Sequence, residues 1–67
     1  MKKIFSLRFG TETYWKVLDA LENLKNTYAE DIEIYIFRNG QNVNIVINVK
    51  NEKKVILEDI EAIKNML

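Results

Sequence analysis

The 67-residue chain contains no cysteine, no histidine and no proline, and only two glycines. Without cysteine it can form neither a disulfide framework nor a thiolate metal site, so the apolar core has to stabilise the fold alone. Without histidine it cannot assemble a Ser-His or Cys-His nucleophile or an ordinary zinc site, and it lacks the commonest general base near neutral pH. Two isolated glycines cannot build a phosphate-binding loop. We therefore expect no enzyme, no cofactor and no catalytic or metal-binding residues.

The charges balance, because 10 lysines and arginines stand against 10 aspartates and glutamates. This balance argues against a dedicated nucleic-acid binder and against a polybasic membrane-surface protein, since both need a basic footprint. The apolar runs are too short to span a bilayer, and Lys2 and Lys3 precede only a brief apolar patch, unlike a signal peptide. We expect a soluble protein, cytoplasmic if it is natural and otherwise a recombinant product.

The chain has the length of one domain, residues 1–67, and 48% hydrophobic residues is typical of a globular protein. Residues 3–9 alternate as in a half-buried strand. The residues on the core side of this strand are Phe5, Leu7 and Phe9. Thr11 is the expected N-cap of a helix from Glu12 to about Tyr28. The apolar stripe of this helix consists of Val17, Leu21, Leu24 and Tyr28, widened by Tyr14 and Leu18.

The dipeptide Asn39-Gly40 separates two segments rich in β-branched residues, 31–38 and 41–50, and predicts a hairpin with a type I′ turn. A two-residue loop at this dipeptide places Arg38 opposite Gln41. The core-facing pairs are then Ile36 with Val43, Ile34 with Ile45, and Ile32 with Ile47. The pairs on the opposite face are Phe37 with Asn42, Tyr35 with Asn44, and Glu33 with Val46. A slip of one residue would exchange the two faces, so the apolar pattern and the turn predict the same facing.

Asn51 is the expected N-cap of a second helix, which runs from Glu52 to the C-terminus. Its core stripe consists of Ile56, Ile60, Ile63 and Leu67, with Val55 at the edge. The alternative for residues 53–57 is a short strand that pairs back on the hairpin.

The element order is therefore β-α-β-β-α. A right-handed crossover leaves a gap between two parallel strands, and the third strand fits into it antiparallel to both. We expect an α+β two-layer sandwich with a three-stranded sheet of order 1-3-2 and both helices on one face. This arrangement resembles a ferredoxin-like split β-α-β fold that lacks its last strand, and the resemblance is one of topology over the whole chain.

Two acidic groups are candidates for binding Mg²⁺ or Ca²⁺ through carboxylate oxygens. The first consists of Glu58, Asp59 and Glu61 on the second predicted helix. The second consists of Glu30, Asp31 and Glu33, before and within the hairpin. Neither group has a converging partner, so we favour a solvated helix face, supported by a contact between Glu61 and Lys64, and a polar loop.

Trp15 is the single tryptophan and lies in the first two turns of the first predicted helix. Tryptophan is enriched at binding hot spots, so this side chain is a candidate anchor for a partner. The alternative, which we favour, is that it covers the edge of the core.

The outer face of the predicted sheet, opposite the helices, is the surface that carries the candidate interaction residues of the chain. Its candidate interaction residues are Ile4, Arg8, Tyr35, Phe37 and Val46. One interpretation is that aromatic and β-branched residues merely stabilise cross-strand pairs. The second is a homodimer through this face. The third is stacking of single-stranded nucleic acid, which the asparagines of the central strand and the few basic residues disfavour.

Caps, periodicity, turn and register all favour the same fold, and no residue breaks these rules in a way that marks a site. In this respect the chain resembles a computationally designed α/β mini-protein, which implies a structural, monomeric domain without a ligand. The asparagines of residues 41–50 and the Lys, Asn and Ile bias are instead typical of a natural chain. The alternative functions are a natural interaction module that dimerises through the outer face and a single-stranded nucleic-acid binder.

Overall fold

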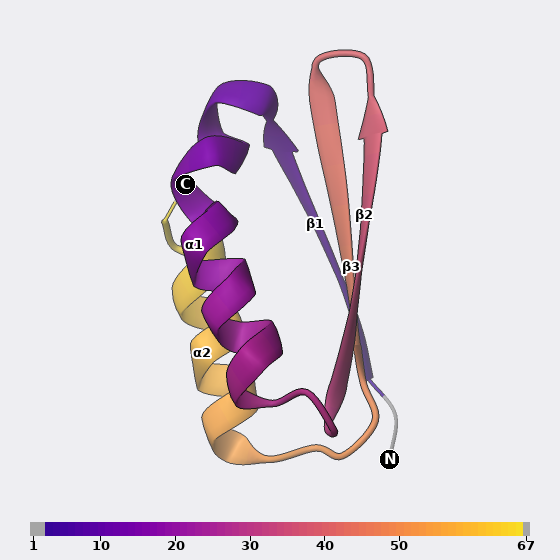
Figure 1. Cartoon of the computed structure of the whole chain (residues 1–67), viewed down its shortest axis with the longest axis vertical. Helices are drawn as coiled ribbons and strands as arrows, with labels where there is room; N and C mark the ends of the chain where they lie inside the picture. Colours follow the sequence, from indigo (N-terminus) through magenta and orange to yellow (C-terminus); the bar gives the residue numbers. More distant parts are fainter. Residues whose placement is uncertain (1–2, 67) are drawn as a thin grey trace.

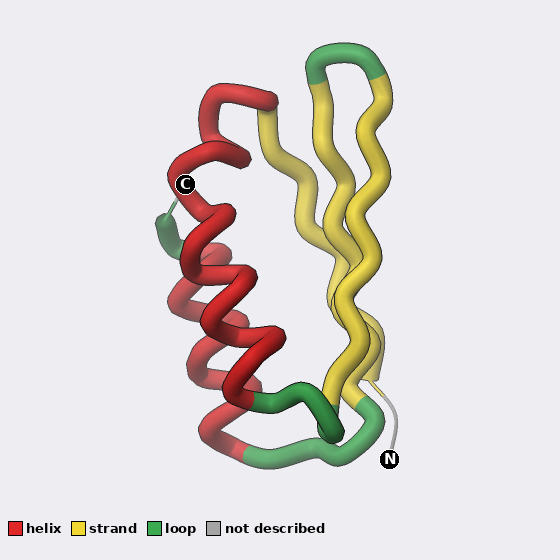
Figure 2. Tube along the Cα trace, in the orientation of Figure 1, coloured by secondary structure: helices red, strands yellow, loops and turns green. Residues whose placement is uncertain are grey.

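The computed structural model describes residues 3–66 and has the element order predicted from the sequence (Figure 1). The elements are β1 (Lys3–Gly10), α1 (Thr11–Thr27), β2 (Ile32–Asn39), β3 (Asn42–Val49) and α2 (Lys54–Lys64). The sheet is antiparallel with the order β1-β3-β2. Both helices lie on the same side of it, as Figure 2 shows. The predicted two-layer α+β architecture is therefore confirmed.

The core fills the space between the helices and the inner face of the sheet, and it is built almost entirely of aliphatic side chains. Its members are Leu7, Phe9, Val17, Leu21, Leu24, Ile32, Val43, Ile45, Ile47, Val49, Ile56, Ile60 and Ile63. The predicted core stripes of both helices thus face inward, but Val55, predicted at the edge of the second stripe, is 52% exposed because it lies off the buried face of α2. Leu67 lies outside the described residues. No polar or charged residue is buried within residues 3–66, so burial of apolar surface is the main source of stability.

The hairpin has the predicted facing, but the predicted register is wrong by two residues. Asn39 pairs with Asn42, so the two-residue loop is Gly40-Gln41 rather than Asn39-Gly40. The observed core-facing pairs are Ile36 with Ile45, Ile34 with Ile47, and Ile32 with Val49, where the prediction had Val43, Ile45 and Ile47. On the outer face, Phe37 pairs with Asn44, Tyr35 with Val46, and Glu33 with Asn48. A shift of two residues keeps every side chain on its face because side chains alternate with a period of two.

The turn itself explains the shift. Gly40 has a φ of 63°, and no other residue among 3–66 has a positive φ. Positive φ at the first central residue alone is the type II′ pattern, whereas the predicted type I′ turn needs positive φ at both central residues. The type II′ turn leaves Asn39 in the ladder, where it pairs with Asn42. The backbone carbonyl of Gln41 also accepts a hydrogen bond of 3.0 Å from the amide of Thr11, joining the turn to the start of α1.

Both predicted N-caps are wrong. Gly10, not Thr11, is the N-cap of α1, and Lys53, not Asn51, is the N-cap of α2. Neither cap makes a side-chain hydrogen bond. The Asn51 side chain instead donates to a carboxylate oxygen of Asp31 at 3.1 Å. Because α2 begins at Lys54, the alternative of a short strand over residues 53–57 is excluded.

Candidate functional site

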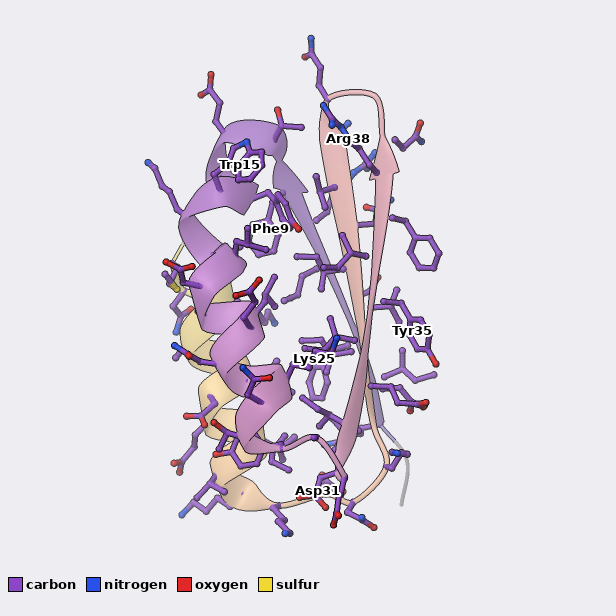
Figure 3. The ribbon with its side chains drawn as sticks, viewed as in Figure 1. Phe9, Trp15, Lys25, Asp31, Tyr35 and Arg38 are labelled. Carbon is purple, nitrogen blue, oxygen red and sulfur yellow. The ribbon has the colours of Figure 1, made fainter. Side chains whose placement is uncertain are left out.

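The outer sheet face carries the five candidate residues predicted from the sequence, and the strand pairing brings them together. We define this face by three cross-strand rows: Ile4–Asn48–Glu33, Ser6–Val46–Tyr35 and Arg8–Asn44–Phe37. The two helices lie on the other side, and Tyr35 points away from them in Figure 3. Within residues 3–66, no element covers this face.

The apolar side chains of the outer sheet face are more exposed than most large apolar residues. Ile4 is 71% exposed, Phe37 56% and Tyr35 46%, whereas Val46 on the central strand is half-buried. Ile4, Val46 and Phe37 follow one diagonal of the face, and Arg8 and Glu33 occupy the ends of the other diagonal. The face therefore consists of an apolar band between two opposite charges. Glu33 also accepts a hydrogen bond of 3.1 Å from the side-chain amide of Asn48.

Trp15 does not cover the core, contrary to the interpretation favoured from the sequence. Its side chain is 69% exposed and contacts the Tyr14 ring, with the ring centroids 5.8 Å apart. It borders a cavity of about 160 Å³ between α1 and the hairpin. The cavity, which we call the Trp15 groove, is lined by Thr11, Tyr14, Trp15, Ile36, Arg38 and Val43.

The Trp15 groove was missed at the sequence level, although two signals pointed to it. Trp15 lies off the stripe formed by the buried residues Val17, Leu21 and Leu24, so helical periodicity directs it away from the core. Ile36 lies on the helix-facing side of the sheet but belongs to an edge strand. Only the packing of the helices shows that this part of β2 stays uncovered, and Ile36 is 45% exposed as a result.

The acidic group on α2 is dispersed rather than convergent. Asp59 accepts a hydrogen bond of 2.6 Å from the Tyr28 hydroxyl, and this bond raises the pKa of Tyr28 above its ordinary value. Glu61 lies 3.9 Å from the Lys64 ammonium group, which confirms the predicted contact within the helix. No cluster of three or more potential metal ligands occurs among the residues that the structure describes.

Asp31, from the second acidic group, connects two loops instead of facing a ligand. Its carboxylate accepts hydrogen bonds from the side chains of Asn51 at 3.1 Å and Lys53 at 3.2 Å. These two donors lower the pKa of Asp31, with Asn51 the larger cause. Its backbone carbonyl accepts from the amide of Lys50 at 2.8 Å. Asp31 therefore joins the loop before β2 to the loop before α2.

Comparison with protein-family models, curated proteins and solved structures finds no match to this chain. Over residues 3–66, neither helix has the length and apolar character that crossing a membrane requires. The outer sheet face and the Trp15 groove are therefore the two candidate functional surfaces of the chain.

Proposed function

We propose that this chain is a non-catalytic interaction domain that pairs with a second copy of itself through the outer sheet face. The observation that carries the proposal is the exposure of Ile4, Tyr35 and Phe37 on one side of the sheet, opposite the helices. A two-layer domain can remove such a face from water by packing it against the same face of a copy.

The arrangement of charges on the outer sheet face supports a copy as the partner. A two-fold axis in the plane of the interface, passing through Val46 and perpendicular to the line from Arg8 to Glu33, exchanges these two charged positions. Each arginine then lies opposite the glutamate of the other copy. Because the two diagonals cross at about 70° for the usual strand spacing and rise, the same axis brings Ile4 near Ile4 and Phe37 near Phe37 of the other copy, with a sideways offset. The face is thus complementary to itself in both charge and apolarity, as an isologous interface requires.

The size of the face predicts a weak dimer. Three strands of eight residues present a footprint of roughly 380 Å², taking a strand spacing of about 4.8 Å and a rise of about 3.3 Å per residue. A standard interface buries about 800 Å² on each partner, so this face belongs with the small, transient interfaces. We expect self-association that depends on concentration and a monomer in dilute solution.

Sedimentation velocity tests the proposal over a range from about 10 µM to about 1 mM, since weak interfaces dissociate at lower concentrations. We expect the sedimentation coefficient to rise with concentration. Arg8→Glu or Glu33→Arg alone should abolish the rise, because each creates two like-charge contacts. The double variant, which exchanges the charges, should restore it. Lys25→Glu is the matched control, because it reverses a positive charge at an exposed position on α1 (Figure 3).

The second candidate function is a structural domain without a partner, in line with the resemblance to designed mini-proteins. The apolar core, aliphatic except for Phe9, supports it, because such a core satisfies the rules of idealised packing. A chain that stays strictly monomeric at the highest concentration would favour the structural domain without a partner over the dimer. Salt-dependent binding of single-stranded oligonucleotides to a monomer would instead favour stacking on Tyr35 and Phe37.

A further inference from the structure

The edge strand β2 exposes an uncharged apolar segment on both faces of the sheet. Tyr35, Ile36 and Phe37 are consecutive, each about half exposed, and none of the four residues 34–37 is charged. In an edge strand, part of the backbone N–H and C=O groups point away from the sheet and can pair with another strand. Edges that must stay free of partners are usually protected by charges, proline or bulges. This segment of β2 has no such charge or proline.

The Trp15 groove adjoins this segment on its helix-facing side. Of the residues that line the groove, Val43 is buried, whereas Trp15 and Ile36 are exposed. Its volume of about 160 Å³ is close to the roughly 150 Å³ apolar cavity that accommodates benzene in another protein. The groove therefore has room for one apolar side chain. Figure 3 shows Trp15 and Arg38 at the same end of the molecule, on α1 and the hairpin.

Arg38 gives the groove a charge preference. It is the charged member of the six lining residues, and it forms no ion pair within residues 3–66. An arginine at the rim of an apolar groove favours an apolar group that carries a carboxylate nearby. Ile36 and Arg38 are two residues apart on β2, so their side chains lie on the same face of the sheet, about 6.8 Å apart along the strand.

We propose that an extended segment of a partner protein pairs with the free edge of β2, placing an apolar side chain in the Trp15 groove and a carboxylate on Arg38. In a strand added to β2, the residues opposite Ile36 and Arg38 are also two positions apart. Antiparallel pairing is the more stable per residue, and it puts the acidic residue before the apolar one. The recognised pattern is therefore an acidic residue, any residue and an apolar residue, in an extended conformation. This site uses the edge and the helix-facing side of β2, and it is separate from the outer sheet face.

Trp15 provides a direct reporter of binding, since it is the single tryptophan of the chain. Its fluorescence would be followed in dilute protein, where the proposed dimer is dissociated, while the peptide Ac-Thr-Glu-Thr-Leu-Thr-NH₂ is added. We expect a saturable change in emission. The isomer Ac-Thr-Thr-Glu-Leu-Thr-NH₂ directs the acidic and apolar side chains to opposite faces and should bind more weakly. The peptide Ac-Thr-Lys-Thr-Leu-Thr-NH₂ should bind more weakly too, because its charge repels Arg38.

Variants locate the binding site. Arg38→Gln should weaken binding about 2- to 5-fold, the range of a solvent-exposed ion pair, whereas Arg8→Gln on the outer sheet face should not. Ile36→Ser should weaken binding about tenfold, which corresponds to the lost burial of two methylene-sized groups. Ile4→Ser is the matched change on the outer sheet face and should leave binding unchanged.

Three results would overturn the proposal. The first is no change in Trp15 emission with any peptide at about 1 mM, which is about a thousandfold above a dissociation constant of about 1 µM. The others are equal binding of all three peptides, or equal effects of Arg38→Gln and Arg8→Gln. Emission that changes with protein concentration in the absence of peptide, and no longer does so in Ile36→Ser, would identify a second copy of the chain as the occupant instead.

Discussion

Ile36 and Ile45 are paired across β2 and β3 on the helix-facing side of the sheet, yet Ile45 is completely buried and Ile36 is 45% exposed. The difference comes from their strands. Ile45 lies on the central strand, with a neighbouring strand on each side and the helices above it. Ile36 lies on the edge strand beside the Trp15 groove. Two identical side chains in one row therefore differ in how much apolar surface they remove from water.

This difference predicts unequal costs of truncation. Ile45→Ala should lower the free energy of unfolding by about 2–5 kcal/mol, because it opens a cavity in the packed core. Ile36→Ala should cost about 1 kcal/mol or less, since solvent already reaches the side chain. Urea unfolding monitored by circular dichroism measures both values. Similar losses at the two positions would contradict the exposure of Ile36.

The geometry of the turn predicts that substitution by alanine costs more stability at Gly40 than at Gly10. Gly40 has a φ of 63°, so Gly40→Ala should destabilise the protein by about 1–2 kcal/mol through backbone strain, although an added Cβ meets no atom within 4 Å. Gly10→Ala is the control, because Gly10 has a φ of −70° and equally open surroundings. There, the weaker N-cap and the less flexible unfolded chain offset each other, and we expect little change. Equal stability of Gly40→Ala and the parent protein would contradict the positive φ at Gly40.

We predict that the folded protein loses stability in acid because Asp31 becomes protonated. Its pKa is lowered in the folded protein by hydrogen bonds from Asn51 and Lys53. Its contribution is therefore complete above the pKa of an unfolded-chain aspartate, about 3.9, and it disappears as the pH falls through the lower pKa of the folded state. Asp31→Asn should be less stable than the parent protein at neutral pH, and the difference should shrink in acid. Asn51→Ala, which removes the first donor, should reduce the acid dependence of the parent protein. Unfolding experiments over a pH series provide the measurement, and a constant difference would refute the prediction.

For Tyr28 we predict the opposite dependence, a loss of stability as the pH rises into the basic range. The hydrogen bond that its hydroxyl donates to Asp59 raises its pKa, so the bond contributes fully below the unfolded-chain pKa of about 10 and is lost as the pH rises through the higher folded value. Asp59→Ala should lower the pKa of Tyr28, because it removes the acceptor of the hydrogen bond and the charge that disfavours the phenolate. Spectrophotometric titration of this variant and the parent protein, with Tyr28→Phe to assign the transition, tests this shift. An unchanged titration of Tyr28 in Asp59→Ala would show that the contact does not persist in solution.

The facing of nearly every side chain could be derived from the order of residues alone. Helical spacing in Val17, Leu21 and Leu24, and alternation along residues 43–49, are local properties of the chain. Burial then selects the apolar side of each element, so periodicity is sufficient to place the core and the outer sheet face. The sheet order was also predicted, from a right-handed crossover with a gap that the third strand fills, and the structure confirms it.

Tertiary structure alone decided the hairpin register, the helix caps and the exposure of Trp15 and Ile36. Asn39-Gly40 is compatible with either of two turns, and the choice of Gly40-Gln41 accompanies the pairing of Asn39 with Asn42 and the hydrogen bond from the Thr11 amide to the Gln41 carbonyl. Asn51 has a capping side chain, but Asp31, distant in the sequence, engages it instead. The position of α1 over the sheet determines which part of β2 remains open. These outcomes depend on contacts between distant segments, which local periodicity does not encode, and they create the Trp15 groove.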